Sequence, residues 1–111
     1  MLRLLILMAA VTAAAPAHAA DADPEYNRAW RQKKCSLYEG FQQEAAARFG
    51  GAGLGTAFLE AQEAFIRSGC TKRVKVCPAS PQELDFANIV SLQMIYAGAT
   101  GSFLPFECRK E

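Results

Sequence analysis

Four cysteines have the widest range of possible chemistry in this chain, because cysteines can form disulfides, hold a metal ion or carry out a redox reaction. They are Cys35, Cys70, Cys77 and Cys108. Zinc sites and thiol oxidoreductases use cysteines separated by only two residues, whereas six residues lie between Cys70 and Cys77. In a short exported chain, this pattern predicts two disulfides, with no metal site and no cofactor.

Histidine occurs once, as His18, within a segment that we expect to be removed. Serine–histidine and cysteine–histidine nucleophiles and most catalytic zinc sites need an imidazole, so we expect no enzymatic activity. Glu60 and Glu63 are spaced for one helical face, but Arg67 follows four residues after Glu63, which indicates a surface ion pair. The glycine-rich segment 50–55 lacks the lysine of a phosphate-binding loop and is interpreted as a flexible turn.

The first 19 residues have the pattern of a secretory signal peptide. Arg3 precedes an apolar run from Leu4 to Ala15, and Ala17 and Ala19 are the small residues needed before a cleavage site. A dozen residues at about 1.5 Å each reach about 18 Å, short of the roughly 30 Å of a membrane core. Cleavage near Ala19 predicts one domain, residues 20–111, that is periplasmic or secreted and has no transmembrane segment.

The net charge of this predicted domain is zero. Loss of Arg3 reduces the 12 basic residues to 11, which equals the 11 acidic residues. A neutral total gives no overall attraction to nucleic acid, so no nucleic-acid partner is expected.

Three helices are predicted in the domain. The first begins at 23–25 and ends at Gly50-Gly51, the second is capped by Thr56 and ends before Gly69, and the third follows a capping box at 80–83. The expected apolar positions of the first two helices are Tyr26, Trp30, Leu37, Phe41, Ala45 and Phe49, and then Phe58, Ala61, Phe65 and Ile66.

The third helix, to about Gly98, is apolar on nearly all sides, which predicts a central helix covered by the others. Segment 71–76 is interpreted as an extended connector, and the irregular tail, 99–111, should pack back onto the core. The expected fold is all-α: a small disulfide-stapled domain with three main helices and an antiparallel hairpin of the first two.

Hairpin geometry favours one pairing of the cysteines. If the turn is centred between Ala52 and Gly53, facing residues have numbers that sum to about 105, as Cys35 and Cys70 do. Cys77 then pairs with Cys108, since the tail is long enough to return along the third helix. The alternative, Cys70–Cys77 with Cys35–Cys108, stays open.

The same register predicts a basic patch beside the first disulfide. Its members are Arg31, Lys33, Lys34, Lys72, Arg73 and Lys75. One interpretation is a solvated surface, partly neutralised by acidic residues at the same end. The other is a docking site for an acidic protein surface or an anionic glycan, to which Tyr38 and Trp30 could contribute, although Trp30 is expected in the core.

These observations favour an exported, non-enzymatic binding module of the bacterial envelope: an inhibitor, an immunity-type protein or an accessory subunit. Segment 35–40 and the late cysteine resemble exported immunity proteins over a handful of positions, from which no family is assigned. The alternative function is a periplasmic chaperone or envelope-stress factor that exposes its apolar helices conditionally. The partner is expected to be another protein or an anionic envelope component.

Overall fold

The structure is a computed structural model that describes residues 10–11 and 24–109. It contains three α-helices, α1 (Pro24–Phe49), α2 (Thr56–Arg67) and α3 (Pro81–Tyr96), followed by a short 3-10 helix, η1 (Gly101–Phe103). The predicted all-α fold is confirmed. The predicted signal peptide lies outside the described residues except for positions 10 and 11.

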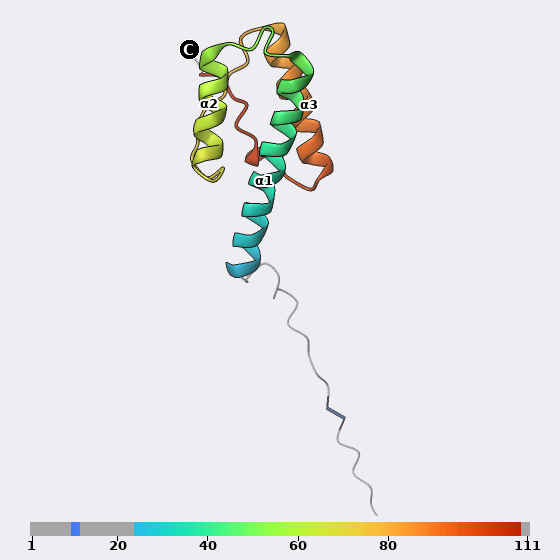
Figure 1. The fold of residues 1–111 in the computed structure, drawn as a ribbon. Coiled ribbons are helices and arrows are strands. Elements are labelled where there is room, and N and C mark those ends of the chain that lie inside the picture. The colour runs from blue at the N-terminus through green and yellow to red at the C-terminus, as the bar shows by residue number, and fades with distance from the viewer. Residues whose placement is uncertain (1–9, 12–23, 110–111) are drawn as a thin grey trace, which may run out of the picture.

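Helices α1 and α2 form the predicted hairpin and run side by side in opposite directions (Figure 1). Helix α1 ends because Gly50 and Gly51 adopt positive φ angles of 61° and 80°, which glycine tolerates best. The prediction that Thr56 caps α2 is wrong: Gly55 is the N-cap residue, and Thr56 is already helical. A side chain from α3 binds the backbone at this point, because the Gly55 N–H donates to the Glu83 carboxylate at 2.9 Å.

Half of the predicted capping box forms at the start of α3: Ser80 caps the Glu83 N–H, whereas the Glu83 carboxylate accepts from the Ala79 N–H rather than from that of Ser80. The Ser80 hydroxyl oxygen accepts from the Glu83 N–H at 3.0 Å and donates to the Gly53 carbonyl at 2.6 Å. The buried Glu83 carboxylate also accepts from the Ala79 N–H at 2.9 Å. The start of α3 is therefore tied to the glycine-rich turn that precedes α2.

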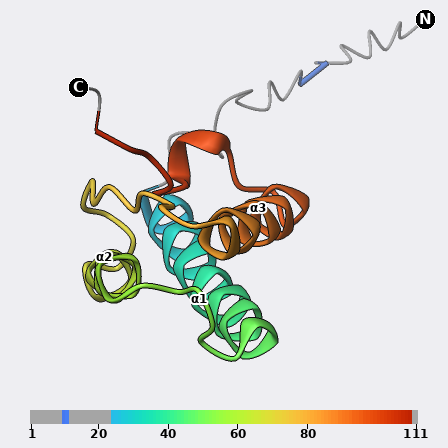
Figure 2. The ribbon, with the colours of Figure 1, turned by 90° about the horizontal axis from the view of Figure 1, so that it is seen from above.

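Helix α1, and not α3, occupies the middle of the domain, with α2 and α3 on its two sides (Figure 2). The prediction of a covered α3 is wrong, because α3 buries one stripe against α1 and leaves its opposite side to solvent. The buried stripe is Glu83, Phe86, Ala87, Val90 and Met94. We define the α3 outer face as the exposed large apolar residues Leu84, Leu92, Ile95 and Tyr96, which are 51–89% exposed.

Aromatic rings from all three helices and the tail fill the core. Tyr38 on α1 has no exposed surface and packs edge-on against Phe65, with ring centroids 5.2 Å apart. Phe103 and Phe106 return from the tail to within 6.3 Å and 6.2 Å of the same ring. The tail therefore packs onto the core as expected, whereas Tyr26, predicted on the buried stripe of α1, is 58% exposed.

The connector between α2 and α3 pairs with the tail at one point. The Val76 N–H donates to the Pro105 carbonyl at 2.9 Å, and the Glu107 N–H donates to the Val76 carbonyl at 3.2 Å. These two bonds form a parallel bridge between Val76 and Phe106. The expected extended connector is thus anchored next to the residues that line the candidate site.

Candidate functional site

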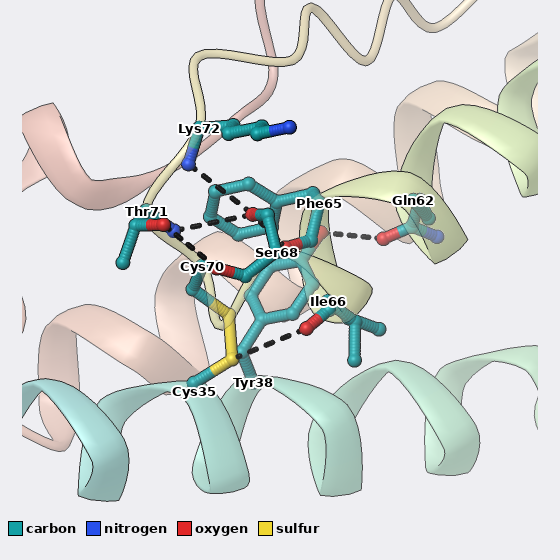
Figure 3. The surroundings of a disulfide bond; sticks show 9 residues. All are labelled: Cys35, Tyr38, Gln62, Phe65, Ile66, Ser68, Cys70, Thr71 and Lys72. Carbon is teal, nitrogen blue, oxygen red and sulfur yellow. Dashed lines mark hydrogen bonds between the residues drawn. A yellow bond between two sulfur atoms is a disulfide. The ribbon is translucent and has the colours of Figure 1, made fainter.

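Two disulfides hold the segments around the candidate site. Cys35 on α1 bonds to Cys70 just after α2, with Cα atoms 5.5 Å apart (Figure 3). Cys77 bonds to Cys108, with Cα atoms 4.6 Å apart. This is the pairing that the hairpin register favours. The first disulfide fixes the connector to α1, and the second fixes it to the tail.

A hydrogen-bonded turn carries the chain from α2 into the connector. Gly69 and Cys70 both have positive φ, 72° and 58°. The Ser68 hydroxyl oxygen accepts from the Thr71 and Lys72 N–H groups at 3.3 Å and 3.2 Å, and the Thr71 hydroxyl donates to the Ser68 carbonyl at 2.7 Å. The turn fixes the backbone from which Lys72 projects (Figure 3).

A buried polar pair lies under the first disulfide. The Tyr38 hydroxyl donates to Gln62 Oε1, and neither residue is more than 1% exposed. Burial raises the pKa of Tyr38 well above its usual value of 10.0 because the charged form would lose its hydration. The suggestion that Tyr38 contributes to a binding face is therefore wrong: the tyrosine is a core residue with its only polar atom engaged inside.

Lys34, one of the predicted basic residues, lies over two aromatic rings. Its ammonium nitrogen is 4.9 Å from the centroid of Phe103 and 5.8 Å from that of Trp30. Trp30 is partly buried and Phe103 packs against the core. A cation at these distances from a ring face is attracted by the ring quadrupole. Lys34 is thereby fixed against the tail.

Two of the connector cations share one carboxylate. Arg73 and Lys75 each lie 3.8 Å from a Glu107 oxygen. The Arg73 side chain remains 84% exposed in this pair, so the pairing neutralises it only weakly. Among the described residues, Arg31, Lys33 and Lys72 form no ion pair.

Helix rotation separates Lys33 from the other predicted basic residues. Each residue turns an α-helix by about 100°, so Lys33 lies about 200° around α1 from Cys35 and therefore on the opposite side. Numbering across the turn places Lys33 at the same height as Lys72 along the hairpin, but it does not include this rotation around the helix axis. Of the six predicted basic residues, Lys72 and Arg73 line one feature of the structure, and Lys34 contacts a ring in its wall.

That feature is a cavity of about 100 Å³ between the connector and the tail, which we call the Phe103 pocket. Its lining is mixed: the apolar side chains of Phe65, Val74, Phe103, Leu104 and Pro105 lie beside the polar residues Thr71, Ser102 and Glu107, and the exposed Lys72 and Arg73 also line it. Sequence analysis missed this pocket, because it combines residues from α2, the connector and the tail that share no local pattern.

The other residues considered for chemistry do not assemble into a site. Glu63 forms a 3.6 Å ion pair with Arg67, and both side chains are more than two-thirds exposed. Within 10–11 and 24–109, no group of three or more histidine, cysteine, aspartate or glutamate side chains is placed to hold a metal ion. None of the described helices combines the length and the apolar character needed to cross a membrane.

The fold and the site together define a small all-α domain, bonded by two disulfides, with a pocket whose mouth is cationic. Comparison with protein-family models, with curated proteins and with solved structures finds no match to the chain.

Proposed function

We propose that this chain is an exported, non-enzymatic binding module of the bacterial envelope, acting as an inhibitor, an immunity-type protein or an accessory subunit. One observation carries the proposal: the exposed Lys72 and Arg73 line a preformed pocket, partly apolar, between segments that the disulfides join. Preorganised pockets beside exposed cations favour recognition of a partner, because little conformational entropy is lost on binding.

Export is part of the same proposal and has its own test. The signal-peptide pattern of residues 1–19 and the two disulfides both suit an oxidising compartment. After expression of the whole chain in a bacterium, we expect the protein in the periplasm or the medium, with an N-terminus at Ala20. A protein that stays in the cytosol with Met1 or Leu2 at its N-terminus would refute export.

The binding function is tested by crosslinking in the native envelope, followed by capture and mass spectrometry. The expected result is one protein recovered in a fixed stoichiometry, which then binds saturably when both proteins are purified. Reduced and alkylated protein serves as the control, since it lacks the disulfides that shape the pocket. If no envelope protein binds saturably, the proposal is wrong.

The α3 outer face favours a second candidate function, a periplasmic chaperone or envelope-stress factor. Its large apolar side chains are already exposed in the folded domain, and exposed apolar patches are typical of sites that hold other proteins. Binding of a hydrophobic dye at low pH, together with suppression of aggregation of an unfolded client protein, would support this function. A stable fold at low pH with one stoichiometric partner would support the binding module.

A further inference from the structure

The Phe103 pocket has the size of a site for a single side chain. Small-molecule sites usually enclose roughly 300–1,000 Å³, whereas this cavity encloses about 100 Å³. A cofactor or a metabolite would therefore remain largely outside it. An anchor side chain supplied by a larger partner would fit inside while the rest of the partner lies across the rim.

Part of the pocket wall suits an apolar anchor. Phe65 is 4% exposed, Pro105 is buried, and Phe103 and Leu104 are partly buried. The hydroxyl residues Thr71 and Ser102 also line the pocket. An apolar side chain that packs against the apolar part of the wall gains free energy as its surface leaves water, so this wall favours a protein segment that carries such a side chain.

The charge at the rim of the pocket favours acidic residues next to that anchor in the partner. Lys72 and Arg73 are the basic residues that line the pocket; Lys34 lies over the Phe103 ring but does not line the pocket itself. The one carboxylate among the lining residues, Glu107, is shared between Arg73 and Lys75. Positive charge is thus in excess at the rim, and this excess is complementary to carboxylates on a partner.

Resting on the proposed binding function, we propose that the Phe103 pocket receives one apolar side chain from an acidic segment of a partner protein. The cations at the rim hold the carboxylates on either side of that anchor. The disulfides keep both walls in place before binding: Cys70 itself lines the pocket, and Cys77–Cys108 joins the connector to the tail. Such a buried central anchor ringed by polar contacts is typical of protein–protein interfaces.

The test is an NMR titration of the oxidised protein, labelled with ¹⁵N, using the blocked peptide acetyl-Asp-Glu-Leu-Glu-Asp-amide. We expect saturable shifts of the Arg73, Phe103 and Leu104 amide signals, with affinity falling as salt is added because the rim charges are exposed. Replacing the central leucine of the peptide by serine should weaken binding by about tenfold or more, since a buried leucine is worth roughly 1.5–3 kcal/mol.

A pair of matched variants isolates the rim. Lys72→Gln with Arg73→Gln should weaken binding of the leucine peptide about two- to thirtyfold, with the wild-type spectrum otherwise preserved, because each lost exposed charge pair contributes about 0.2–1 kcal/mol. Lys33→Gln with Arg48→Gln removes the same charge from exposed positions on α1, outside the pocket. This control should keep wild-type affinity.

Four results would overturn the proposal: no shifts at millimolar peptide, equal affinity for the serine peptide, equal affinity of the rim variant, or tighter binding of an oligogalacturonate at the same amides. The proposed function fails separately. If the rim variant captures a native partner as well as the wild type does, the pocket is not the binding site, but the binding function still holds. If no partner is found, the binding function itself is refuted.

Discussion

The Phe103 pocket and the α3 outer face are both exposed, but different interactions create them. The pocket brings together α2, the connector and the tail, and it depends on two disulfides. The α3 outer face belongs to one helix, and its four apolar side chains are exposed wherever α3 is helical. The pocket is thus a product of tertiary structure, whereas the outer face is a product of local sequence.

Because of this difference, substitutions in the two regions should have different effects on the stability of the protein. Changes that loosen the disulfides or the buried polar contacts should lower the free energy of unfolding, and those at the first disulfide should also disorder the pocket. Changes on the α3 outer face should leave the folded state almost as stable as before.

The largest effect is expected for Cys35→Ala combined with Cys70→Ala. This disulfide closes a loop of 35 residues, for which the chain-entropy estimate gives about 4 kcal/mol of unfolding free energy. Urea unfolding measures the loss, and amide exchange should rise first in the connector and last in α3. A loss below about 1 kcal/mol, or early exchange in α3, would contradict the comparison.

Glu83→Gln should lower the free energy of unfolding by about 2 kcal/mol, because hydrogen bonds to a charged group contribute about 1.5–3 kcal/mol. The buried Glu83 carboxylate accepts from two backbone N–H groups outside α3. Neither of these donors lines the Phe103 pocket. Chemical unfolding monitored by circular dichroism gives the value. Glu60→Gln, an exposed change on α2, is the control and should stay within about 0.5 kcal/mol of the wild type. Equal stability of the two variants would show that Glu83 does not link the helices.

Tyr38 should make stability fall at alkaline pH. Burial raises its pKa in the folded state above the unfolded value of 10.0, so the unfolded chain loses this proton first as pH rises. The contribution of Tyr38 to the free energy of unfolding is complete below pH 10. Above pH 10 this contribution should decrease by about 1.4 kcal/mol per pH unit. Unfolding measured between pH 9 and 11 should show this decrease in the wild type and in Tyr96→Phe, an exposed control. Tyr38→Phe should show a shallower decrease, and an unchanged slope would refute the assignment.

The smallest effect on stability is expected for Leu92→Gln combined with Ile95→Gln. Both side chains are more than half exposed on α3, so the free energy of unfolding should change by less than about 1 kcal/mol. Binding of a hydrophobic dye to the folded protein should decrease, whereas the affinity for the acidic peptide should not. A loss of several kcal/mol would mean that the α3 outer face is covered in solution.

Local signals in the sequence predicted much of the fold. Ser80, Pro81 and Glu83 defined the start of α3, and the numbering across the turn selected Cys70 as the partner of Cys35. These signals work because caps, turns and hairpin register depend on residues close together in the chain. The same kind of signal failed at Thr56, because Gly55 is the N-cap residue and its N–H donates to a carboxylate from a distant helix.

Long-range packing accounts for the features that the sequence did not predict. Helix α3 is apolar on nearly all sides, so periodicity could not indicate which stripe α1 would cover. Tyr38 looked suited to an interface, yet its hydroxyl meets Gln62 in the core. The Phe103 pocket needs Phe65, Lys72 and Phe103 together, and no local pattern joins them.

Peptide mapping of the oxidised protein under non-reducing conditions tests the central claim most directly, because the two disulfides join the connector beside the pocket to α1 and to the tail. The account predicts one crosslinked fragment containing Cys35 and Cys70 and a second containing Cys77 and Cys108. Fragments that join Cys35 to Cys108, or four free thiols in the purified exported protein, would contradict it.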